Sequence, residues 1–61
     1  MQNKQEILED AYEALANSVR SCKNVSNIKV EYGNAGFKSE LLKDFSETAY
    51  YLTQIIKELE K

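Results

Sequence analysis

The sequence lacks histidine, proline and tryptophan altogether, and its 61 residues include only one cysteine and two glycines. Histidine is the commonest side chain that titrates near neutral pH, so its absence excludes Ser-His-Asp triads and histidine-based metal sites. A single cysteine, Cys22, can form no disulfide within the chain and cannot supply a structural zinc site. Gly33 and Gly36 match neither phosphate-binding glycine motif, G-x-G-x-x-G or the Walker sequence. We therefore expect no cofactor, no metal and no enzymatic activity.

Long hydrophobic runs are missing as well. The longest continuous apolar run is Ala49–Leu52, whereas a membrane-spanning helix needs about 20 apolar residues. The first residues lead into acidic sequence rather than into the apolar core of a signal peptide. We therefore expect a cytoplasmic protein with no membrane contact, and one unpaired cysteine fits that compartment.

What the chain does contain is enough apolar and charged sequence for one small domain over residues 1–61. It is 43% hydrophobic and 30% charged with a net charge of −2, which is typical of a folded chain. A chain of this size buries only about 60% of its unfolded surface, and its core seldom contributes more than about 3–5 kcal/mol. With neither a disulfide nor a zinc site to help, self-association is the remaining source of stability. We therefore expect a homodimer.

The first half of the chain has the pattern of an amphipathic helix over about residues 4–22. Its apolar residues recur at steps of three and four, and acidic and polar residues occupy the other side. Cys22 continues the apolar face, so we interpret it as a small buried hydrophobe rather than a nucleophile. The apolar residues of this pattern are Ile7, Leu8, Ala11, Tyr12, Leu15, Val19 and Cys22.

A second helix is predicted over about residues 39–60 by a more regular pattern. Steps of four and three join Leu41, Phe45, Thr48, Leu52, Ile55 and Leu59, while Leu42, Ala49 and Ile56 flank them at steps of seven. On this heptad Leu41 and Ile55 share one position of the apolar seam, and Phe45 and Leu52 share the other.

The connector between the helices, about residues 23–38, leaves two interpretations open. Residues 28–32 alternate apolar and charged side chains and end at a glycine-rich turn, which favours a short strand. A lone strand has no partner within this chain, so it would have to pair with its twin in a dimer or with another protein. In the alternative, the connector is irregular or helical, and Val25, Ile28 and Tyr32 cover the end of the bundle.

These elements predict an all-α fold, a two-helix antiparallel hairpin with at most one short β segment, which dimerises into a four-helix arrangement. The residues expected to form the oligomer core are the large apolar members of the two helical patterns: Leu8, Leu15, Leu41, Phe45, Leu52, Ile55, Ile56 and Leu59.

Two surface features are candidate sites for a protein partner. Glu6, Glu9, Asp10 and Glu13 place four carboxylates within about two helical turns, with like-charge pairs that slightly destabilise a helix. This patch would suit a partner with a basic surface, although it is equally the kind of solvated face that keeps a small protein soluble. Tyr50 and Tyr51 are efficient interface residues, but they could also be plain exposed tyrosines.

We therefore expect a non-enzymatic module for protein–protein interaction, acting as a regulator, adaptor or inhibitor. Its composition, rich in lysine, asparagine and glutamate, resembles that encoded by AT-rich bacterial or phage genomes, which allows a phage-borne inhibitor of a host factor. A structural subunit of a larger assembly is one alternative. Another is a nucleic-acid-binding dimer, because residues 23–38 carry a net charge of +2 between two helices of −2 each. The pI of about 5.0 argues against this second alternative. Its basic and aromatic residues would be Arg20, Lys23, Lys29, Lys38, Tyr32 and Phe37.

Overall fold

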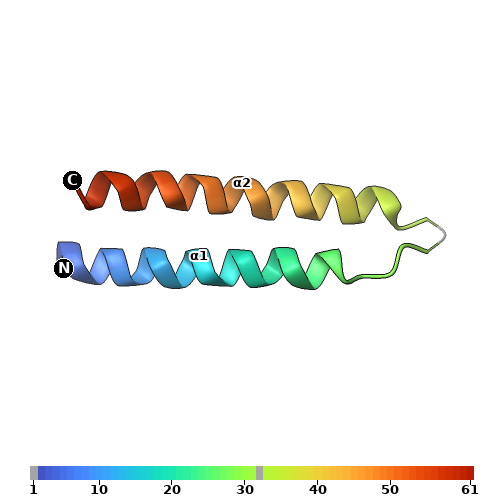
Figure 1. Cartoon of the computed structure of the whole chain (residues 1–61), viewed down its shortest axis with the longest axis horizontal. Helices are drawn as coiled ribbons and strands as arrows, with labels where there is room; N and C mark the ends of the chain where they lie inside the picture. The colour runs from blue at the N-terminus through green and yellow to red at the C-terminus, as the bar shows by residue number, and fades with distance from the viewer. Residues whose placement is uncertain (1, 32) are drawn as a thin grey trace.

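The computed structural model of the chain describes residues 2–31 and 33–61. Two long helices, α1 (Lys4–Ser26) and α2 (Ala35–Leu59), run antiparallel and side by side, joined by a short connector (Figure 1). The molecule is a rod of 47 × 17 × 14 Å with both termini at one end. The predicted all-α helical hairpin is therefore confirmed.

Both helices extend further into the connector than the sequence pattern predicts. α1 ends at Ser26 rather than near residue 22, and α2 begins at Ala35 rather than near residue 39. The connector therefore shrinks to residues 27–34. Continuing a helix satisfies each backbone N–H and C=O within the same segment, whereas a lone extended segment leaves these groups without partners.

The expected strand at residues 28–32 is absent from residues 28–31, and Tyr32 lies outside the described residues. Side chains bind the connector backbone instead of a neighbouring strand. The Asn34 side chain accepts a hydrogen bond from the Glu31 N–H (2.8 Å) and donates one to the Lys29 carbonyl (3.2 Å). The Lys38 ammonium donates to the carbonyl of Ile28 at 2.8 Å. Of the two interpretations, the irregular connector is the correct one over the described residues.

Local sequence sets the start of α1 and the turn before α2. The Asn3 side chain accepts a hydrogen bond from the Glu6 N–H at 2.9 Å, which caps the first turn of α1. Gly33 has a φ of 90°, a backbone conformation that glycine adopts without the strain that other residues would suffer there. Nothing lies within 4 Å of a Cβ built on Gly33, so backbone strain rather than crowding favours glycine at this turn.

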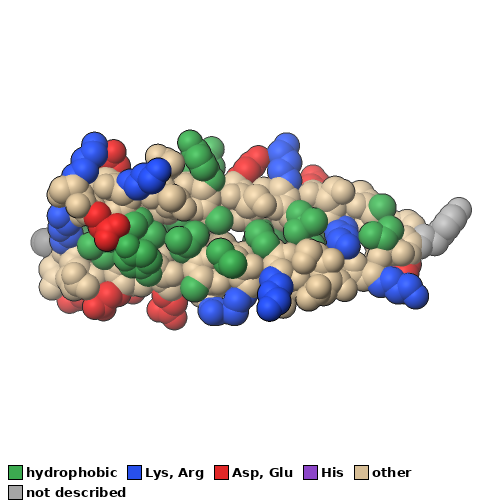
Figure 2. Space-filling view, viewed as in Figure 1, with side chains coloured by type: hydrophobic (Ala, Val, Ile, Leu, Met, Phe, Trp, Pro, Cys, Tyr) green, Lys and Arg blue, Asp and Glu red, His purple; other side chains and the backbone are tan. Residues whose placement is uncertain are grey.

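One line of side chains on each helix faces the other helix, and we call these two lines the seam. Figure 2 shows hydrophobic side chains along the line where the helices meet. The members alternate steps of three and four residues, as in a coiled coil, and all are buried or partly buried. None of the large described side chains is fully buried. The seam consists of Leu8, Ala11, Leu15, Ser18, Cys22 and Val25 on α1, with Leu42, Phe45, Ala49, Leu52, Ile56 and Leu59 on α2.

This seam differs from the predicted register of the second helix. Phe45 and Leu52 lie in the seam as expected, but the set Leu42, Ala49 and Ile56 takes the place that the prediction gave to Leu41, Thr48 and Ile55. Ile56 is 6% exposed, whereas its neighbour Ile55 is 47% exposed. The two sets differ in composition: the buried set is wholly apolar, whereas the displaced set includes the polar residue Thr48, whose hydroxyl donates to the Asp44 carbonyl within α2.

The thin seam predicts a sharp contrast between two valines of α1. Val25 is 7% exposed and Val19 is 56% exposed. Val25→Ala removes two buried methyl groups and should lower the free energy of unfolding by about 2 kcal/mol. Val19→Ala makes the same change in helix propensity at an exposed position. It should change the free energy of unfolding by less than about 0.5 kcal/mol. Urea unfolding followed by circular dichroism measures both, and equal losses would contradict this seam.

Candidate functional site

Two rows of residues border the seam and define the two long sides of the hairpin. On each helix, the first row consists of the residues that directly follow every second seam residue: Ala11, Ser18 and Val25 on α1, and Phe45, Leu52 and Leu59 on α2. The second row consists of the residues that directly precede the other seam residues: Leu8, Leu15 and Cys22 on α1, and Leu42, Ala49 and Ile56 on α2. Because the helices are antiparallel, the following rows of both helices share one side, and the preceding rows share the other. The Tyr12 flank consists of Tyr12, Val19, Ser26, Ser46, Thr53 and Glu60. The Ile55 flank consists of Ile7, Ala14, Ser21, Leu41, Thr48 and Ile55.

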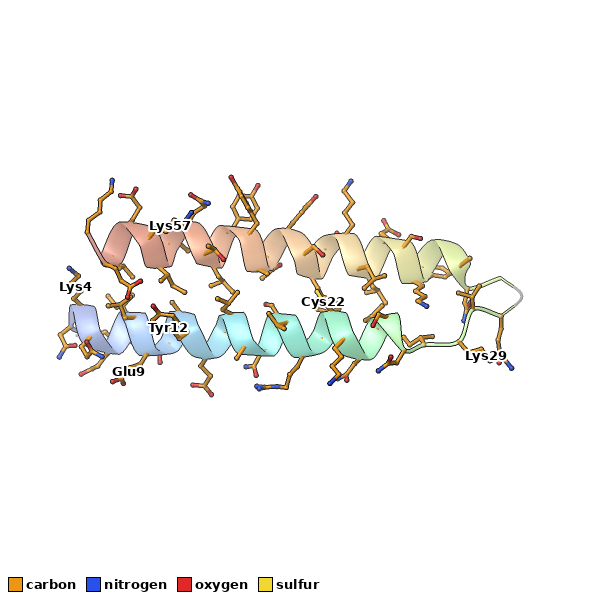
Figure 3. All side chains as sticks on the ribbon, in the orientation of Figure 1. Lys4, Glu9, Tyr12, Cys22, Lys29 and Lys57 are labelled. Atoms are coloured by element: carbon orange, nitrogen blue, oxygen red, sulfur yellow. The ribbon has the colours of Figure 1, made fainter. Side chains whose placement is uncertain are left out.

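The Tyr12 flank is joined across the two helices by polar contacts. The Tyr12 hydroxyl donates a hydrogen bond to the Glu60 carboxylate at 2.9 Å, which links the start of α1 to the end of α2. Figure 3 shows Tyr12 between the two helices near the open end of the hairpin. Near the middle of the rod, the Cys22 Sγ lies 4.0 Å from the Ser46 Oγ. Cys22 is partly buried in the seam, on the apolar face where the sequence placed it.

The contact with Glu60 also changes the chemistry of Tyr12. The hydrogen bond to Glu60 is the main cause that raises the pKa of Tyr12 above its usual value of 10.0, with smaller contributions from desolvation and from the Glu60 charge. The neutral hydroxyl can donate to the carboxylate, whereas the phenolate cannot and would be repelled by it.

The Ile55 flank has a different character because its residues are apolar or small. Ile7, Leu41 and Ile55 are all partly exposed, with Leu41 at 41% and Ile55 at 47%. Ala14, Ser21 and Thr48 complete the flank, so none of its six residues carries a charge. Ile28, also exposed, lies in the connector beyond its end.

The predicted acidic patch lies on the outward side of α1. At 100° per residue, Glu6, Glu9, Asp10 and Glu13 fall within about a third of the helix circumference, opposite the seam. All four side chains are exposed, and Figure 3 shows Glu9 pointing away from α2.

Among the described residues, neutral side chains rather than cations contact this patch. Gln2 donates to Asp10, and Gln5 donates to Glu9 at 3.4 Å. Within residues 2–31 and 33–61 the one salt bridge joins Glu58 and Lys61 at the far end of α2. The carboxylates of the patch therefore keep their charge open to solvent.

The predicted aromatic pair lies on the outward side of α2. The rings of Tyr50 and Tyr51 are exposed and meet edge to face, with centroids 5.9 Å apart and an interplanar angle of 68°. These two residues lie opposite the seam of α2, as the acidic patch lies opposite the seam of α1. The structure therefore does not bring the two candidate sites together.

The residues of the expected oligomer core are divided between two locations. Leu8, Leu15, Phe45, Leu52, Ile56 and Leu59 lie in the seam within the hairpin. Leu41 and Ile55 lie on the Ile55 flank, where they are exposed.

The candidate basic connector does not form a single surface segment. Arg20 and Lys23 belong to α1, Lys29 lies in the connector and Lys38 belongs to α2. The Arg20 guanidinium donates to the Asn17 side chain, and Lys38 is bonded to the connector backbone. Phe37 is exposed on the first turns of α2, whereas Tyr32 lies outside the described residues.

The chemistry that this arrangement offers is that of surfaces. The part of the chain that the structure describes contains no pocket and no cluster of three or more potential metal ligands. Neither of its helices includes a stretch long and apolar enough to cross a lipid bilayer. No family model, curated protein or solved structure matches the chain. The candidate sites are therefore the two flanks, the acidic patch and the tyrosine pair.

The raised pKa of Tyr12 gives a testable pH dependence. Because the folded state holds the Tyr12 proton more tightly than the unfolded state, the stabilisation from this contact is complete below pH 10 and is lost as the pH rises through the folded pKa. Titration of the Tyr12 ring carbons by NMR should give a pKa above 10.0. In Glu60→Ala the pKa of Tyr12 should fall toward its usual value, because the hydrogen-bond acceptor and its charge are removed. An unchanged Tyr12 pKa in that variant would contradict the contact.

Proposed function

We propose that this protein is a small, non-enzymatic interaction module that acts as a helical dimer and binds another protein as a regulator, adaptor or inhibitor. The observation that carries this proposal is the amount of apolar side chain that the hairpin leaves exposed. Large hydrophobic residues are exposed on both flanks, in the connector and on the outward side of α2. Among them, Ile7, Leu41 and Ile55 share one side of the rod, and exposed apolar residues that gather on one side of a small domain are typical of interaction sites.

The shape of the chain supports this proposal. A compact domain of 61 residues has a radius of gyration of about 10.5 Å, whereas that of the hairpin is 14.5 Å. A rod of only two helices can bury one line of residues from each helix, and its other apolar residues need a further surface to cover them. A four-helix arrangement of two hairpins supplies that surface in the simplest way.

The acidic patch and the tyrosine pair support the binding of a second protein. The carboxylates of Glu9 and Glu13 are exposed and lie in a part of α1 that seam packing does not use. An electropositive partner would gain a faster association rate from such a patch. The tyrosine pair, on the opposite side of the rod, offers a large contact area with two polar tips.

The dimer is tested by the mass of the protein in solution. Sedimentation equilibrium over roughly 1–100 µM should give about twice the chain mass of 7.0 kDa. The melting temperature should rise with protein concentration, because association stabilises the folded state by mass action. A monomer whose melting temperature does not depend on concentration would contradict the proposed dimer.

The partner-binding surface is tested by charge reversal. A tagged chain captures its partner from the native host, and association kinetics are then measured at low and high salt. The double variant Glu9→Lys with Glu13→Lys should bind at least about tenfold more slowly at low salt and show a flatter salt dependence.

The matched control is Glu40→Lys with Asp44→Lys. It makes the same change in net charge at the same spacing, at exposed positions on α2. This control should keep most of the association rate of the natural sequence. Equal effects from both double variants would mean that net charge alone matters, and unchanged kinetics in both would mean that the patch is only a solvated surface.

A further inference from the structure

We propose that two copies of this chain pair through the Ile55 flank, with a twofold axis passing beside Thr48. This inference rests on the proposed function, since it names the face and the geometry of the proposed dimer. The occupant of the flank is a second copy of the same chain.

Charge distinguishes the two flanks. Burying an unpaired charge is costly, so an interface between copies favours a side that carries none. The Tyr12 flank includes the Glu60 carboxylate, which accepts a hydrogen bond from Tyr12. The six residues of the Ile55 flank carry no charge, so covering them removes apolar surface from water.

The width of the apolar face on α2 also indicates a further helix. A strict two-helix seam uses two positions of every seven, whereas helices in bundles present three. Besides its two seam positions, α2 has a third row at Leu41, Thr48 and Ile55, with two large aliphatic side chains about half exposed. Within the hairpin no helix covers this row.

The hairpin exposes more surface than a compact domain of the same mass. A compact monomer of 7.0 kDa exposes about 4,040 Å², whereas this chain exposes 4895 Å². The excess is about 850 Å². A standard stable interface buries about 800 Å² on each partner.

The spacing of the flank is self-complementary. Leu41 and Ile55 lie seven residues on either side of Thr48, which is about 10.5 Å along the helix in each direction. A twofold axis beside Thr48 and perpendicular to α2 therefore sets Leu41 of each copy against Ile55 of the other, as an isologous interface requires. The small side chains of Thr48 and Ser21 leave no bulk near the centre to hold the copies apart.

This pairing leaves Glu9, Glu13 and Tyr50 accessible, whereas Asp10 and Tyr51 border the Ile55 flank. Glu9 and Glu13 lie on the side of α1 away from the Ile55 flank, and Tyr50 has the corresponding position on α2. The dimer would therefore present two acidic patches and two exposed tyrosines.

Aspartate substitutions on the two flanks test which face is buried. Leu41→Asp and Ile55→Asp should each raise the dimer dissociation constant at least about 100-fold in sedimentation velocity, since they place a charge in the interface. Val19→Asp, at an exposed position on the Tyr12 flank, is the matched control and should raise it less than about threefold. Natural-sequence affinity in the two Ile55-flank variants, or monomer formation by Val19→Asp alone, would overturn the assignment.

Cross-linking tests the axis without relying on a variant that might unfold. In a Cys22→Ser background, Thr48→Cys should form a disulfide-linked dimer when oxidised glutathione is supplied. Ser46→Cys, two residues away on the Tyr12 flank, should remain largely unlinked.

The outcomes separate the two proposals. A dimer that links through Ser46→Cys and not through Thr48→Cys would overturn the assigned face and leave the proposed function standing. A chain of the natural sequence that sediments as a monomer would overturn both.

Discussion

The structure depends on one constraint: two helices lying side by side can cover only one line of side chains on each other. That line is the seam, and its residues are mostly part-buried because no third element covers its edges. The rod shape, the exposed flanks and the lack of any fully buried large side chain among the described residues all follow from this limit. The hairpin is thus a fold whose apolar sequence exceeds what its own architecture can bury.

Hydrophobic periodicity was sufficient to predict the two helices and their antiparallel pairing, because each apolar pattern is long and regular. It was insufficient at the connector, where each helix continues four residues beyond its predicted end and Val25, three residues after Cys22, extends the seam of α1. It also misplaced the register of α2. Leu41 and Ile55 directly precede Leu42 and Ile56, so both sets fit the same steps of three and four, and the wholly apolar set is the buried one.

The candidate sites were predictable from the sequence to different degrees, because some are local in the sequence and others join residues that are far apart in it. The acidic patch and the tyrosine pair are local in sequence, so helical geometry alone places each on the outward side of its helix. Their separation on opposite sides of the rod follows only from knowing where both seams lie. The bond between Tyr12 and Glu60 joins residues 48 positions apart, and no local pattern could indicate it. The Ile55 flank emerged only once the register of α2 was fixed.

The two ends of the rod are held together by different means, and this bears on how folding and association are coupled. At the closed end the connector backbone is bound by Asn34 and Lys38. At the open end the helices are joined by side-chain contacts, among them the bond from Tyr12 to Glu60. In the proposed dimer each connector lies beside the open end of the other copy, because the axis runs perpendicular to α2. Each copy would then contact the open end of its partner, so that the thin seam and the interface between copies support each other.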